Sequence, residues 1–304
     1  QSLETTMIRL DDTSGSAVAA AIAAERRRLG SPTTGMVLTL LILSDEDNAS
    51  DATNASVEAA RQHPMRIITL IPRPGKVPAR LDAQISVGGD LGPGEVAELR
   101  LRGELADYAN SVAVPLLLPD TPVVAFWPGE CPAVPADDLI GRHAQRRITD
   151  AAGAADPIAA LRARSVGYRP GDTDLTWARL TPWRSVLASA LDQDSTPVTS
   201  VQIEAEANNP SSLLLQAWLR DCLHVDVSLA DSEGPGITAV RLLTDGGDIS
   251  ISRGDGVHAV LARPGAPDSP IALRRRDYAA LVSEELRRLD PDEVYGRTIT
   301  GMFR

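Results

Sequence analysis

The side chains best suited to binding chemistry are concentrated between Phe126 and Arg184. This stretch carries five of the ten aromatic residues of the chain, together with eight arginines. Tryptophan and arginine dominate the energetic hot spots of protein interfaces, because each offers a large contact area and a polar group. The stretch therefore predicts a surface that binds a partner. Its candidate contact residues are Trp127, Arg142, Arg146, Arg147, Trp177, Arg179, Trp183 and Arg184.

The charge of this stretch differs from that of the whole chain. From Arg142 to Arg184 the eight arginines face four aspartates, which leaves a net charge near +4, whereas the chain as a whole carries −11. The spacing of Arg142, Arg146 and Arg147 would place all three on one side of a helix. Such a cluster would suit a phosphate, a carboxylate or an acidic protein patch. The alternative is a solvated face whose arginines pair with acids of the same chain, such as Asp150, and the sequence leaves both interpretations open.

Two polar motifs elsewhere favour structural roles. Asp45-Glu46-Asp47 follows a predicted buried strand, where the carboxyl end of a sheet could hold a divalent metal. We expect these acids to cap the next helix instead, because no third ligand follows at metal spacing. The glycine-rich segment Gly88–Gly94 matches neither of the nucleotide-binding glycine motifs and lies between predicted strands, which favours a hairpin turn.

No residues are spaced like a nucleophile and its general base. His143 lies among arginines and is expected on a helix surface, and Cys131 lies beside prolines and is expected to be a small side chain in a turn. The sequence has no elbow motif for a nucleophilic serine. We therefore expect no catalytic residues, no cofactor and no metal.

Composition sets further limits. A chain of 304 residues is long enough for two domains, and its longest apolar runs are too short to span a bilayer. Two cysteines without a CxxC motif exclude a disulfide scaffold. The acidic balance argues against nucleic-acid binding, and no secretion signal opens the chain, so we expect a cytoplasmic protein. Whether residues 1–6, which precede Met7, are native is left open.

Hydrophobic patterns predict the elements that must position these residues. In the first half we expect helices at residues 16–29, 48–63, 105–117, 139–149 and 157–164, and strands at 36–43, 66–71, 82–87, 96–101 and 122–127. Residues 36–71 then form a βαβ unit. In the second half we expect helices at 175–191, 211–223 and 277–289, and strands at 198–204, 225–229, 237–243, 248–252 and 257–262.

The turn-rich segment Tyr168–Asp174 suggests a division between the halves. We expect an N-terminal α/β domain over residues 1–167, with a βαβ unit and a mixed sheet. A C-terminal α+β domain over residues 168–304 should have a mostly antiparallel sheet and flanking helices. The fold class is therefore α/β with two small domains.

Four segments of this sequence resemble the OpcA family of glucose-6-phosphate dehydrogenase assembly proteins. They are Leu117–Gly129, Arg146–Asp150, Gly171–Arg184 and Leu289–Gly296, and residues 80–90 extend the match. The string Asp-Thr-Asp-Leu-Thr-Trp within Gly171–Arg184, followed by Thr-Pro-Trp-Arg, is long and unusual. The composition, with Lys76 as its one lysine, is similar to that of actinobacterial members.

The resemblance implies a non-enzymatic partner of glucose-6-phosphate dehydrogenase that assembles or allosterically activates it, at the entry to the oxidative pentose phosphate pathway. It supplies no catalytic residues. Redox control has been associated with cyanobacterial relatives, and two isolated cysteines give no support for it here. The alternative function is a sugar-phosphate-binding sensor or enzyme that uses Arg142, Arg146 and Arg147.

Overall fold

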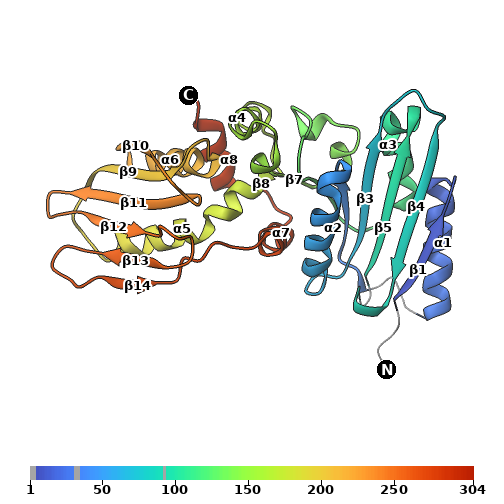
Figure 1. Cartoon of the computed structure of the whole chain (residues 1–304), viewed down its shortest axis with the longest axis horizontal. Helices are drawn as coiled ribbons and strands as arrows, with labels where there is room; N and C mark the ends of the chain where they lie inside the picture. Colours follow the sequence, from blue (N-terminus) through green and yellow to red (C-terminus); the bar gives the residue numbers. More distant parts are fainter. Residues whose placement is uncertain (1–4, 31–34, 92–93) are drawn as a thin grey trace.

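The chain forms two β-sheets, each with its own helices, that lie side by side along the long axis of the molecule (Figure 1). The structure is a computed structural model, and it describes residues 5–30, 35–91 and 94–304. Part of the predicted Gly88–Gly94 turn, residues 92 and 93, lies outside the described residues. The α/β fold class is confirmed, with one parallel-rich sheet and one mostly antiparallel sheet.

The first sheet has eight strands in the order β1-β4-β5-β3-β2-β6-β7-β8. Their bounds are β1 Thr6–Leu10, β2 Leu38–Leu43, β3 Met65–Arg73, β4 Arg80–Val87, β5 Glu95–Arg102, β6 Val123–Trp127, β7 Arg146–Thr149 and β8 Asp172–Asp174. The six strands from β5 to β8 in this order are parallel, and β4 and β1 add an antiparallel edge. Numbered along the chain, the parallel strands have the order 3-2-1-4-5-6, which is that of doubly wound sheets that bind dinucleotides.

Helices cover both faces of the first sheet. One face packs against α1 (Gly15–Leu29) and α3 (Ala109–Ala113). The other packs against α2 (Glu46–Ala60), the beginning of α5 (Leu175–Asp192) and α7 (Tyr278–Leu286). Because the central strands β2 and β3 are buried on both faces, their sequences are mostly apolar rather than alternating, with Thr39, Arg66 and Thr69 as buried polar exceptions.

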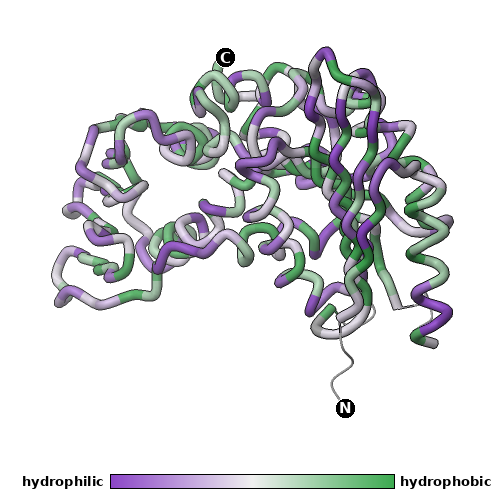
Figure 2. The backbone as a smooth tube through the Cα atoms, turned by 45° about the vertical axis from the view of Figure 1, so that its right-hand side comes forward, coloured by the Kyte–Doolittle hydropathy of each residue, from purple (hydrophilic) through white to green (hydrophobic). Residues whose placement is uncertain are grey.

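The second sheet has six strands in the order β10-β9-β11-β12-β13-β14. Their bounds are β9 Val198–Glu206, β10 Asp226–Ser232, β11 Ile237–Thr244, β12 Ile249–Ser252, β13 Ala259–Ala262 and β14 Ser269–Ile271. Helices α5 and α6 (Pro210–Leu223) cover its buried face, and α4 (Pro157–Gly167) and α8 (Glu293–Gly301) pack with α6 and add side chains to the same core. The other face of β9 and β11 carries exposed side chains such as Gln202 and Arg241, and the loops at its outer end are mostly hydrophilic (Figure 2).

Most predicted elements are present, and the largest error lies in the predicted interface. The predicted helix at residues 139–149 is wrong, because Gly141–His143 forms one short 3-10 turn and Arg146–Thr149 forms strand β7. The predicted helix at 105–117 is a series of short helical turns. Strands β1, β8 and β14 were not predicted.

The packing of elements crosses the predicted division between residues 167 and 168 in both directions. Strand β8 follows the division and pairs with β7 of the first sheet, whereas α4 precedes it and places Leu161 in the core of the second sheet. Helix α7 also follows it, and Leu281, Val282 and Leu286 pack on the first sheet. The division into residues 1–167 and 168–304 stays a prediction.

Candidate functional site

Two of the predicted contact residues, Arg146 and Arg147, lie inside the molecule. Neighbouring residues of a strand point to opposite faces of the sheet, so their side chains diverge. Arg146 pairs with Glu285 of α7 and donates to the Asp290 carbonyl oxygen at 3.0 Å. Arg147 pairs with Asp172 of β8 and donates to the Ala144 carbonyl oxygen at 2.9 Å. Both guanidinium groups are therefore used to join segments that are distant in the sequence.

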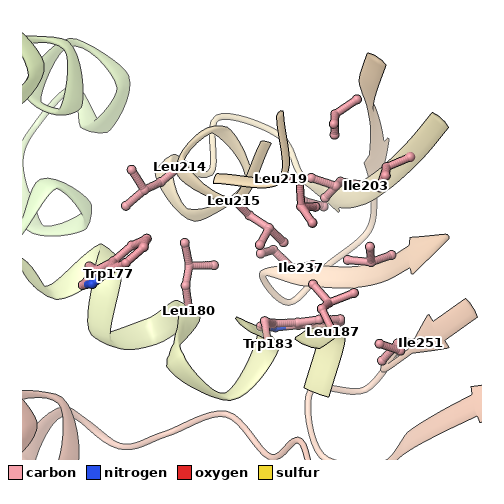
Figure 3. Close-up of a cluster of buried hydrophobic side chains, with 14 of the residues drawn as sticks. Trp177, Leu180, Trp183, Leu187, Ile203, Leu214, Leu215, Leu219, Ile237 and Ile251 are labelled. Atoms are coloured by element: carbon pink, nitrogen blue, oxygen red, sulfur yellow. The ribbon is translucent and has the colours of Figure 1, made fainter. Parts of the chain in front are cut away.

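The three tryptophans of the predicted surface are also buried. Trp127 ends β6 and is 3% exposed, within the core on the α1 face of the first sheet. Trp177 and Trp183 both lie on α5, and they belong to the core that α5 forms with α6 and the second sheet (Figure 3). The Trp177 Nε1–H donates to Asp292 at 3.0 Å, which ties α5 to the start of α8.

Arg179 and Arg184 are half-buried on α5. Arg179 forms a bidentate pair with Asp150, at 2.7 and 3.0 Å. Asp150 therefore pairs with Arg179, not with an arginine of the cluster at positions 142, 146 and 147. Arg184 stacks on Trp177, with its guanidinium carbon 3.6 Å from the ring centroid. The Arg179 pair holds α5 to the loop that follows β7, whereas the Arg184 stack lies within α5.

Burial changes the pKa of an aspartate at the start of α5. Asp174 caps the helix and accepts hydrogen bonds from the Thr176 and Ala151 amides and from the Thr149 hydroxyl. Burial and the nearby charge of Asp150 raise the pKa of Asp174. The hydrogen bonds from these three donors offset part of the free-energy cost of burying the carboxyl group.

Arg142 is the exposed member of the predicted set. It lies in the loop between β6 and β7, beside exposed Leu139 and His143. Gly167 at the end of α4 packs closely on Ala133 of the same loop. Val166, 82% exposed, is therefore close to this loop. The structure does not bring Arg142, Arg146 and Arg147 together, and contact of any predicted residue with a partner stays a prediction.

A second candidate site lies at the carboxyl ends of the parallel strands. In doubly wound sheets, ligands bind there at the point where the strand order reverses, which in this chain falls between β2 and β6. A cavity of about 380 Å³ occupies this position. It is lined by Trp127 at the end of β6 and by residues that follow the two strands, among them Asp45, Glu130 and Cys131.

The residues of this crevice do not suit a dinucleotide. The turn from β2 into α2 has no glycine motif, and Asp45 occupies the helix N-terminus, where its carboxylate accepts the Asn48 amide at 2.9 Å. This confirms the predicted cap. A pyrophosphate bound here needs that N-terminus and backbone amides, and it would meet the charges of Asp45 and Glu130.

The crevice also lacks an activated nucleophile. Burial raises the pKa of Cys131 to about 11, so its thiol is protonated at neutral pH. Among the residues that the structure describes, no group of three or more His, Cys, Asp or Glu could hold a metal ion. In the same residues no helix is long and apolar enough to cross a membrane.

Two family models cover most of the chain. Residues 56–166 match the glucose-6-phosphate dehydrogenase subunit N-terminal domain, and residues 170–299 match the corresponding C-terminal domain. The chain belongs to the OpcA family. The N-terminal model matches the first half of the chain and the C-terminal model matches the second half. The predicted family is therefore confirmed.

Two solved proteins similar to this OpcA chain are oxidoreductases. KijD10, a 3-ketoreductase from Actinomadura kijaniata, is 11% identical with a TM-score of 0.49, and the match covers 87% of this chain and 94% of that one. An oxidoreductase from Sinorhizobium meliloti is 10% identical with a TM-score of 0.43, over 88% and 86% of the two chains. No curated protein sequence matches this chain.

Sequence reasoning missed a third group of residues. Arg253 and the run Arg274–Arg276 line a cavity on the second sheet, remote in the sequence from the aromatic stretch. The run of three arginines was the available signal. Arg253 could not be found from the sequence, because its burial in the structure distinguishes it and no sequence motif does.

Proposed function

We propose that this protein binds glucose-6-phosphate dehydrogenase and promotes its active oligomer or conformation, without catalysing the reaction itself. The observation that carries the proposal is the match of both halves of the chain to models of a glucose-6-phosphate dehydrogenase subunit. The protein would thereby act at the entry to the oxidative pentose phosphate pathway.

The crevice of the first sheet supports a non-catalytic role. Its position is that of a dinucleotide site, yet the turn after β2 has an aspartate cap where a phosphate-binding turn needs glycines and free amides. The residues therefore argue against NADP binding by this chain.

We place the docking surface on the loop between β6 and β7 and on the end of α4. Arg142 is exposed there, and Leu139 and Val166 supply apolar contact. A partner can reach these side chains without a rearrangement of the chain. Buried Arg146, Arg147, Trp127, Trp177 and Trp183 would then stabilise the fold that carries this surface rather than contact the partner.

Activation requires different affinities for two states of the dehydrogenase. A tenfold increase in activity by population shift needs about 1.4 kcal/mol of difference in binding free energy. The test measures dehydrogenase kinetics and the mass of the complex by size-exclusion light scattering, with and without this protein. We expect a co-eluting complex with higher activity, and no NADP reduction by this protein alone.

Three charge reversals locate the surface. Arg142→Glu should slow association and weaken activation, because a rim charge acts mainly on the association rate. Arg241→Glu tests the open face of the second sheet, and Arg27→Glu on exposed α1 serves as the control. If activation occurs and only Arg241→Glu impairs it, the docking surface is the second sheet. If the wild-type protein neither binds nor activates the dehydrogenase, the proposed function is wrong.

A further inference from the structure

A cavity of about 320 Å³ lies on the second sheet, on the side that α5 and α6 cover. Its walls come from α5, from the first turn of α6, from the start of β11 and from the segment that precedes α7. Trp183 and Ile237, which lie near one another in Figure 3, form part of its inner wall. The cavity is distinct from the crevice of the first sheet, which lies beside β2 and β6.

Arg253 lies in this cavity with its charge unbalanced. It is 5% exposed, and its two terminal nitrogens donate to the carbonyl oxygens of Leu273 and Ile237 at 2.6 and 3.2 Å. Its Nε has no hydrogen-bond partner. Among the ion pairs of the described residues none includes Arg253, and Asp255, the nearby carboxylate, is bound to His258. The Arg253 guanidinium carbon also lies 5.0 Å from the centroid of the Trp183 ring, a cation–π contact that supplies no negative charge. A buried cation without a carboxylate partner is costly, which points to an anion that completes the site.

Other cations surround the same space. Five arginines and one carboxylate, Glu206, line the cavity. Arg179 and Arg276 are balanced by Asp150 and Glu284 outside it, and Glu206 accepts the Gly236 amide at 3.0 Å. This leaves three arginines against one carboxylate. Arg274 and Arg275 are exposed, so they can adjust to a ligand.

The N-terminus of α6 contributes to the same cavity. This helix has 14 residues, and its cap Asn209 and first-turn Ser211 line the cavity wall. The Asn209 side chain accepts the Ser211 amide at 2.8 Å, so the cap is neutral where α2 has an aspartate. A helix N-terminus carries partial positive charge and favours bound phosphate groups.

We propose that this cavity binds a small phosphorylated metabolite through Arg253, Arg274, Arg275 and the N-terminus of α6. Guanidinium groups match the oxygens of a phosphate monoester and can donate to two of them at once. The volume lies at the lower end of the ~300–1,000 Å³ range of small-molecule sites, which suits a sugar phosphate better than a dinucleotide. The proposal does not depend on the dehydrogenase.

Binding to the purified chain tests the site. Calorimetry and thermal unfolding would be measured with glucose 6-phosphate, inorganic phosphate and sulfate, and with glucose as the uncharged control. We expect saturable binding of glucose 6-phosphate, weaker binding of inorganic phosphate, and no effect of glucose. Equal affinity for all three anions would indicate an adventitious ion only and would overturn the proposal, as would the absence of binding at millimolar concentrations.

Two sets of variants assign the binding to these residues. Arg274→Glu/Arg275→Glu changes exposed side chains, so the variant should fold and lose at least tenfold in affinity, about 1.4 kcal/mol. Arg287→Glu/Arg288→Glu, a matched exposed pair after α7, should bind as the wild type does. Arg253→Met should also abolish binding; because it also removes the hydrogen bonds to the Leu273 and Ile237 carbonyl oxygens, its thermal unfolding is measured to show that the unliganded variant is folded. Unchanged affinity in the Arg274/Arg275 variant contradicts the site.

Discussion

At the scale of the residue, the arginines of the aromatic stretch fall into three environments. Arg142 is solvated, Arg146 and Arg147 are buried in ion pairs, and Arg184 lies against the ring of Trp177. Removing one partner of a buried ion pair leaves a charge in a medium of low polarity, whereas an exposed charge is screened by water. The same substitution therefore has different effects at positions that are close in the sequence.

Reversal of the buried charges should destabilise the fold. Arg146→Glu/Arg147→Glu places new carboxylates beside Glu285 and Asp172, and we expect a loss of at least 3–5 kcal/mol, roughly the cost of breaking one buried pair. Urea unfolding measures the loss. Arg142→Glu is the control and should change stability by less than about 0.5 kcal/mol. Equal stability of the two variants would mean that the ion pairs contribute nothing to the fold.

The sequence could show that these arginines were unusual but not what surrounds them. Their clustering and their spacing were visible, and so was the nearby Asp150. The partners Glu285 and Asp172 lie 139 and 25 residues away along the chain. Such pairings follow from the order of strands in the sheet, which a local pattern does not contain.

At the scale of the element, long apolar segments were predictable and short ones were not. Strands β2 and β3 are mostly hydrophobic, and α1 begins after a serine cap and ends before Gly30, whose φ is +64°, so local physics favours these elements. Strand β7 has only four residues, Arg-Arg-Ile-Thr, and two of them are charged. It forms because β6 and β8 pair with it on both sides and because long-range acids neutralise its arginines.

The caps of the last two helices should contribute different amounts to the free energy of unfolding. Asp277 caps α7 through the Ala280 amide at 2.8 Å. Asp292 caps α8 through the Tyr295 amide at 2.9 Å and also accepts the indole N–H of Trp177. We expect Asp277→Ala to cost about 1 kcal/mol, the usual value of a cap. Asp292→Ala should cost about 1–3 kcal/mol more, because it leaves a buried donor unpaired.

Equilibrium urea denaturation of both variants measures this difference. Asp292→Asn keeps an acceptor for the indole and a side chain that can cap, so it should restore most of the loss. Equal losses for Asp277→Ala and Asp292→Ala would show that the bond to Trp177 does not stabilise the protein.

At the scale of the whole molecule, the two sheets share elements across the middle of the chain. Helix α7 comes from the C-terminal part and covers the first sheet, and α4 comes from the N-terminal part and packs with α6 and α8 (Figure 1). The anion cavity and α7 are linked in the same way, because Arg276 lines the cavity and donates to the Ala178 carbonyl and to Glu284 of α7. A ligand in the cavity of the second sheet would therefore lie beside the segment that leads into α7, and α7 packs on the first sheet.

This arrangement predicts how the chain behaves when it is divided at the proposed boundary. A fragment of residues 1–167 lacks β8, which pairs with β7 from Asp172 to Asp174, and lacks α7, whose Leu281, Val282 and Leu286 cover the sheet. Burial of a leucine or valine side chain contributes about 1.5–3 kcal/mol, so the loss of α7 alone removes roughly 5–9 kcal/mol, comparable to the whole stability of a domain. We expect neither 1–167 nor 168–304 to unfold cooperatively when expressed alone.

Co-expression of the two fragments should restore the fold. The surfaces that each fragment exposes are complementary, since α7 and β8 of one complete the sheet of the other and α4 completes the second core. The pair should co-purify as one species and melt in a single transition, which size-exclusion chromatography and calorimetry measure. Two fragments that each melt cooperatively and elute separately would instead establish the boundary at residues 167 and 168 as a division between independent domains. In that case the contacts of α7 with the first sheet would be an interface between domains, free to open when the dehydrogenase binds.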